Sequence, residues 1–104
     1  MDLMKLMKDA QQMQERLQKA QEELARITVA GSAGGGMVVA EADGRGIVTK
    51  VRIDPSVVNP ADVEMLEDLV TVAVNEAQKK AQQTAAQEMS KVTGGMNLPF
   101  GLPG

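Results

Sequence analysis

The fold is decided largely by residues 1–27, MDLMKLMKDAQQMQERLQKAQEELARI. Apolar residues recur through this stretch every three or four positions and form one seam: Leu3, Leu6, Ala10, Met13, Leu17, Ala20, Leu24 and Ile27. A mean spacing of about 3.5 residues is the period of a helix whose narrow apolar face packs against another helix. Glutamines and charged residues occupy most of the positions between, together with Met4 and Met7. The stretch therefore predicts a long amphipathic helix over residues 2–26.

The middle of the chain consists of short β-branched segments separated by turn residues. Strands are predicted at residues 27–30, 37–42 and 46–53. The glycine-rich stretch 31–36 is typical of a flexible connection between the first two strands, and Asp43-Gly44 is a strong hairpin signal. These segments predict a three-stranded antiparallel meander.

A second long helix is predicted over residues 60–93. Asn59 suits its N-cap and Pro60 its first position, while Gly94-Gly95 would end it. Residues 94–104, rich in Gly and Pro, are expected to form a flexible tail. The predicted class is α+β, with a single α-β-β-β-α domain over residues 1–93. The halves of the two helices far from the sheet should run antiparallel as a protruding arm.

Composition excludes several classes of function. The 104 residues contain no Cys and no His, which removes disulfides, thiolate metal sites and His-based catalytic arrangements. We therefore expect neither an enzyme nor a bound cofactor or small-molecule substrate. No apolar run approaches the ~20 residues of a transmembrane helix, and the N-terminus lacks a secretory apolar segment. These features predict a cytoplasmic protein.

Charge is unevenly distributed along this chain of net charge −3. Residues 60–76 hold five acids and no Lys or Arg, whereas the arm carries several cations. Five lysines are expected toward the tip of the arm: Lys5, Lys8, Lys79, Lys80 and Lys91. With Arg16 and Lys19 from the first helix they are candidates for contacting DNA phosphates. The alternative is that the five lysines belong to ordinary solvated helix faces.

Two further motifs favour structure over chemistry. The glycine-rich stretch lacks the Gly-Lys-Ser/Thr ending of a phosphate loop and precedes a strand. The acids at positions 62, 64, 67 and 68 lack the Gly-punctuated spacing of a calcium loop. Phe100 is the single aromatic residue, so the chain has no platform for stacking single-stranded bases.

Four stretches of the chain carry a family resemblance: MKDAQQMQERLQKAQEEL (7–24), VRIDPSVV (51–58), EMLEDLVTVAVNEA (64–77) and GGMNLPFG (94–101). Together they resemble the YbaB/EbfC family of bacterial nucleoid-associated proteins over nearly the whole length. The resemblance implies an α-β-β-β-α protomer, a tweezer-shaped homodimer and a nucleoid location. It also implies binding to double-stranded DNA that alters DNA conformation with limited sequence preference and contributes to gene regulation.

The favoured interpretation is a non-enzymatic homodimer that binds double-stranded DNA with its helical arms. Apolar residues on both faces of the second strand favour burial against a partner chain. The alternative is a protein-interaction adaptor or chaperone-like module that grips other proteins with the same arms. Salt-dependent binding to duplex DNA discriminates between the two.

Overall fold

The computed structural model describes residues 2–93, which form an elongated protein with extents of 70 × 25 × 16 Å. Helix α1 (Leu3–Arg26) leads into strands β1 (Thr28–Ala33), β2 (Val38–Asp43) and β3 (Val48–Ile53). A short 3-10 turn, η1 (Pro55–Val57), precedes helix α2 (Val63–Thr93). The predicted α-β-β-β-α order is confirmed. The predicted tail, 94–104, lies outside the described residues.

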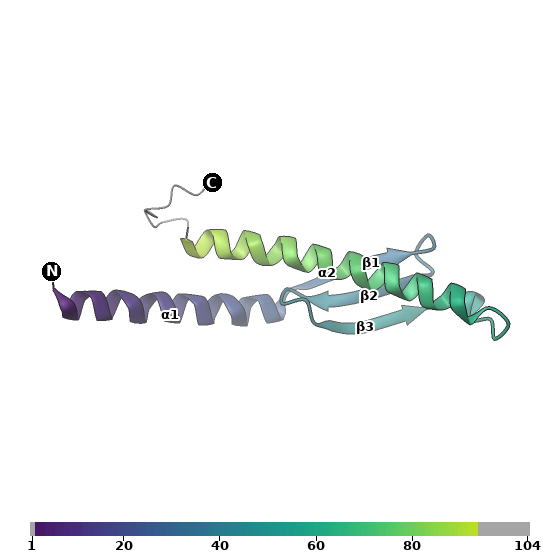
Figure 1. Ribbon diagram of the computed structural model, residues 1–104, viewed down its shortest axis with the longest axis horizontal. Helices are drawn as coiled ribbons and strands as arrows, with labels where there is room; N and C mark the ends of the chain where they lie inside the picture. The colour runs from purple at the N-terminus through teal and green to yellow at the C-terminus, as the bar shows by residue number, and fades with distance from the viewer. Residues whose placement is uncertain (1, 94–104) are drawn as a thin grey trace.

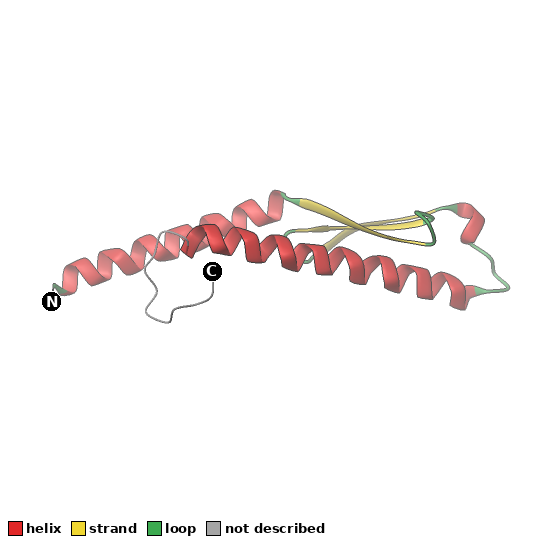
Figure 2. Ribbon diagram, turned by 90° about the horizontal axis from the view of Figure 1, so that it is seen from above, coloured by secondary structure: helices red, strands yellow, loops and turns green. Residues whose placement is uncertain are grey.

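The two helices share one long axis but differ in what they cover (Figure 1). The first half of α2 lies across one face of the sheet, and its second half continues beyond the sheet beside α1 (Figure 2). The two helices run in opposite directions, as predicted for an arm. However, α2 ends partway along α1, so within residues 2–93 the N-terminal half of α1 has no neighbouring element.

The sheet is an antiparallel meander in the order β1-β2-β3. Strand β1 runs through Gly31 and Ser32 to Ala33, which extends it three residues beyond the predicted end. Gly31 belongs to the strand because α2 lies directly on it: a Cβ there would collide with Ala77 N and Ala73 O. The turn is confined to the glycines that follow, of which Gly34, Gly35 and Gly36 have positive φ.

Helix α2 begins at Val63, three residues later than predicted. Asn59 instead accepts a hydrogen bond from the Ala61 amide (3.0 Å), which forms a turn before the helix. Asp62 accepts from the Met65 amide (3.2 Å) and thereby satisfies one of the free N–H groups at the helix start. Pro60 therefore lies in the turn and not in the first helical position.

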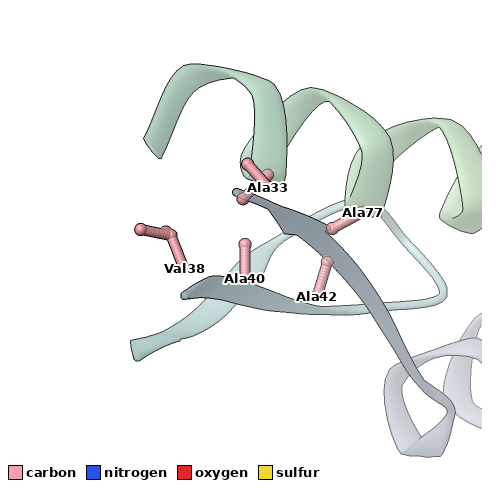
Figure 3. Packing of buried hydrophobic residues seen from close by; sticks show 6 residues of the cluster. Ala33, Val38, Ala40, Ala42 and Ala77 are labelled. Carbon is pink, nitrogen blue, oxygen red and sulfur yellow. The ribbon is translucent and has the colours of Figure 1, made fainter. Parts of the chain in front are cut away.

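The core between α2 and the sheet is built from small side chains (Figure 3). Its fully buried residues are mostly alanines: Ala33, Val38, Ala40, Ala42, Ala73 and Ala77. Alternate residues of β2 point toward α2, as the period of a strand requires. Because these side chains are short, the helix backbone comes close to the strand backbone. Among the described residues, only Leu24 and Val38 are both large and fully buried.

The apolar seam of α1 is only partly covered. Ala20 and Leu24, near the sheet, are buried, whereas Leu3, Leu6 and Leu17 are 70, 48 and 40% exposed. The cause is the length of α2, which stops beside the middle of α1. Within the described protomer the predicted helix–helix contact is therefore limited to the C-terminal part of the seam.

Candidate nucleic-acid interface

Four of the predicted site residues form a stripe along α1. Lys5, Lys8, Arg16 and Lys19 are exposed and fall on one helical face beside the apolar seam, with Gln12 in the gap between them. Among the described residues, none of the four is within ion-pair distance of a carboxylate. The stripe therefore presents exposed cations along a rigid helix without close ion pairs, although acids such as Asp9, Glu15 and Glu23 lie on neighbouring positions of the same helix.

A groove of about 350 Å³ lies where α2 ends against α1. Arg16, Lys19 and Lys91 line it, so the structure brings together three of the predicted cations from two helices. Glu23 and Glu88 line it as well, and the Lys91 Nζ lies 3.0 Å from Glu88 Oε1. The groove is positive by one charge, and Lys91 is partly neutralised by its neighbour.

Lys79 and Lys80 lie at the base of the arm, not toward its tip as the sequence predicted. The preceding residue, Gln78, donates a side-chain hydrogen bond to the Gly46 carbonyl (3.2 Å) in the turn between β2 and β3. In the same turn, the Gly44 amide donates to the Leu24 carbonyl (2.9 Å) at the end of α1. The part of α2 around Gln78 and the C-terminal end of α1 therefore contact the same turn, next to the sheet. In addition, Lys80 Nζ pairs with Glu76 Oε1 at 3.2 Å.

The cations on the strands have acidic neighbours. Arg52 lies 3.6 Å from Glu41, and Lys50 is directly opposite Glu41 in the register of β2 and β3. Asp54 on the same edge accepts from the Ser56 amide, and this hydrogen bond lowers the pKa of the Asp54 carboxyl. The outer face of the sheet is therefore closer to neutral than the α1 stripe.

The turn between β2 and β3 contains a tight ion pair that the sequence analysis did not identify. Arg45 donates to Asp43 Oδ2 through its guanidinium (2.7 Å), and Asp43 Oδ1 accepts from the Arg45 and Ile47 amides. The Arg45 guanidinium hydrogen bond lowers the pKa of the buried Asp43 carboxyl below its usual 3.8. Asp43 is thus a structural anion that holds the turn. The pattern Asp-Gly-Arg-Gly is the sequence signal for such a turn.

The opposite end of the molecule is acidic. Asp62, Glu64, Glu67 and Asp68 lie exposed at the start of α2, and the described chain has no cation between positions 60 and 76. The stripe on α1 lies toward the other end of the 70 Å axis. Charge is therefore segregated lengthwise, and a polyanion would be attracted to the arm and repelled from the far end.

The described residues offer no metal-binding cluster of three or more acids. No helix within residues 2–93 has the length and apolar character needed to cross a bilayer. The hollows on the surface are open grooves along helices, and the two carboxylates with lowered pKa are held by turn hydrogen bonds. The features that distinguish the described surface are its elongated shape and its distribution of charge.

These features define a class of protein by its shape and charge: an elongated α-β-β-β-α chain with a line of exposed cations on a projecting helix. The sequence profile of the YbaB/EbfC DNA-binding family matches residues 1–96, and the chain belongs to that family. The chain is 52% identical over 103 residues to a nucleoid-associated protein of Gemmatimonas aurantiaca, covering 99% of both chains. It is 53% identical over 94 residues to the nucleoid-associated protein TTE0040 of Caldanaerobacter subterraneus, covering 90% of this chain and 85% of the relative.

A solved structure supports the fold independently. The crystal structure of an uncharacterized protein from Helicobacter pylori superposes with a TM-score of 0.77 and covers 88% of this chain and 96% of its own. At 22% sequence identity, this likeness bears on the fold alone.

Proposed function

We propose that the protein is a nucleoid-associated, double-stranded DNA-binding protein that acts as a homodimer in the bacterial cytoplasm. Its arms contact the phosphate backbone, with little sequence preference, and alter the conformation of the duplex. Through this it contributes to nucleoid organisation and gene regulation. Membership of a DNA-binding family supports DNA as the ligand, and the relatives named as nucleoid-associated proteins support the nucleoid as the location.

The observation that carries this proposal is the α1 stripe. Its four cations are exposed and free of ion pairs within the described protomer, and they lie on one face of a helix that projects from the fold. Lysines and arginines with this freedom neutralise phosphates and release the counterions condensed on DNA. Phosphate contacts fix position and carry no sequence information, so weak sequence preference follows.

Exposed apolar residues on the sheet support the homodimer. Ile47, Val51 and Ile53 lie on or beside the edge strand β3 and are 52, 39 and 39% exposed. Val51 and Ile53 face the α2 side of the sheet, because they pair with Ala40 and Val38. An edge strand with exposed apolar side chains is a favourable surface for a second copy. A dimer through this edge would carry two arms.

A salt series on duplex DNA tests the proposal. Replacing Arg16 and Lys19 with Gln removes up to four phosphate contacts per dimer, so the log–log salt slope should fall by up to about 4. Replacing Lys79 and Lys80 with Gln should reduce it less, because Lys80 is paired with an acid. The measurement is fluorescence anisotropy on two duplexes of unrelated sequence, which should lose affinity in parallel.

The matched control is Lys50→Gln with Arg52→Gln, which removes the same charge from the sheet. We expect this variant to keep the wild-type slope. If it loses binding while both arm variants retain it, the DNA surface is the sheet. The adaptor alternative predicts no salt-dependent binding in any of the proteins.

A further inference from the structure

The tip of α1 is unusually apolar for an exposed helix end. Leu3, Met4 and Met7 are 70, 79 and 65% exposed, and no other part of the described chain covers them (Figure 1). A hollow of about 610 Å³ runs beside the two methionines and is also lined by Lys5 and Lys8. We name Met4, Lys5, Met7 and Lys8 the tip surface. Clustered exposed apolar side chains of this kind mark an interaction site.

A second exposed apolar stripe lies at the other end of the molecule. Met65, Leu69 and Val72 follow one another at helical spacing on α2, and they line a hollow of about 350 Å³. Met65 and Val72 are 40 and 54% exposed. Acids border the stripe on both sides, since Asp62, Glu64 and Asp68 line the same hollow. We name these six residues the acidic-end surface.

We propose that the tip surface of one copy docks on the acidic-end surface of the next, so that the protein associates head to tail. The two surfaces are complementary in both respects that matter. Flexible methionine side chains of the tip fit an irregular apolar hollow, and Lys5 and Lys8 meet a border of carboxylates. Asp2 also lines the tip hollow and reduces its net charge to +1, whereas the acidic-end hollow holds three acids and no cation, so pairing either surface with itself would mainly place like charges together.

The position of the two surfaces determines the kind of assembly. They lie at opposite ends of an axis of 70 Å, so the contact is heterologous and leaves a free surface at each end of every pair. Between successive protomers such a contact propagates into an open chain, and the protomer length of 70 Å corresponds to roughly 20 base pairs at ~3.4 Å per step. The contact involves a few helical turns on each side, so it is weak and depends on concentration.

This association goes beyond the proposed function and requires no DNA. The test is therefore the weight-average mass of the purified protein, measured without DNA by sedimentation equilibrium and light scattering. The unit mass is fixed at high salt, where the charge contact is screened. At low salt, the wild-type mass should rise above this unit with concentration up to several hundred micromolar.

Charge reversal identifies the surfaces. Lys5→Glu with Lys8→Glu should hold the protein at its unit mass, and so should Glu64→Lys with Asp68→Lys. The chain carrying all four substitutions should regain the concentration-dependent rise, because both signs are exchanged. Lys79→Glu with Lys80→Glu makes the same change of charge at the base of the arm and should leave the rise intact.

Three outcomes would overturn the proposal: a wild-type mass that stays at the unit at low salt, growth that survives reversal of the tip, or a fourfold variant that stays at the unit. None of them bears on DNA binding, which is tested separately through Arg16 and Lys19. The unit mass at high salt reports on the homodimer. Failure of the head-to-tail contact and failure of the proposed function are therefore distinguishable.

Discussion

Gly31 is the position where the packing of α2 on the sheet is most open to test. Glycine in a strand normally costs about 0.5–1 kcal/mol relative to Ala, so Gly31→Ala would ordinarily stabilise the protein. Here the structure predicts the opposite sign. A Cβ at this position would lie 2.8 Å from the Glu76 Cβ and would collide with Ala77 N and Ala73 O. Two of these three atoms belong to the backbone of α2 and cannot move without the helix.

The magnitude follows from the displacement required. Ordinary contact needs about 3.4–4 Å, so α2 must retreat from β1 by roughly 1 Å, and a gap of that size loses a quarter to a half of each dispersion contact along the core. Overpacking alone costs about 1–3 kcal/mol. We expect Gly31→Ala to lower the free energy of unfolding by about 3 kcal/mol or more, and the melting temperature by roughly 12 °C or more. Gly31→Val should be worse.

Urea denaturation followed by circular dichroism measures the effect, and Ser32 is the control. Ser32 is the next residue of β1, is exposed and points to the opposite face. Ser32→Ala removes an exposed hydroxyl, and Ser32→Val replaces it with two methyl groups; both should change stability by less than about 0.5 kcal/mol. A neutral or stabilising effect of Gly31→Ala would show that α2 does not lie on β1 as described.

Two other substitutions probe the arm and the turn. Leu24→Ala should lower the free energy of unfolding by about 2–5 kcal/mol in urea denaturation, because Leu24 is 2% exposed. Leu17→Ala should lower it by only about 1 kcal/mol, because Leu17 is 40% exposed. Equal losses would mean that another chain covers the seam at Leu17. Asp43 has a folded pKa below the unfolded value, so its contribution is present above about pH 4 and is lost as pH falls through the folded pKa. The Asp43→Asn variant should therefore melt at a lower temperature than the wild type at pH 7 and should lose less stability on acidification. Thermal melts at pH 7, 4 and 2.5 measure both effects. An acid dependence equal to that of the wild type would contradict the role of Asp43 as the anion that holds the turn.

Periodicity and turn residues together were sufficient to predict most of the fold. The 3.5-residue seam identified α1, and the Asp43-Gly44 signal identified the hairpin between β2 and β3. Both signals are local, because they depend on residues within one or two turns of each other.

The features that sequence could not predict depend on contacts between distant segments. Gly31 looked like part of a linker because its role in the strand is set by Ala73 and Ala77 of α2, which lie more than 40 residues away in the sequence. The position of Lys79 and Lys80 depends on where α2 crosses the sheet, and the bond between Gln78 and Gly46 marks that level. Arg16, Lys19 and Lys91 meet for the same reason. The sequence was sufficient to name the candidate cations, but not to predict which of them lie together in the structure.

The alanine-lined core has a calorimetric consequence. Unfolding a domain raises the heat capacity by about 12–15 cal/mol/K per residue, mainly because apolar surface becomes hydrated. In the described protomer, only Leu24 and Val38 are large and fully buried, while several large apolar side chains are already exposed in the folded state. The protomer therefore gains less apolar hydration on unfolding than a compact domain of equal length. Its stability curve is flatter, with a shallow maximum and a weak dependence on temperature on either side.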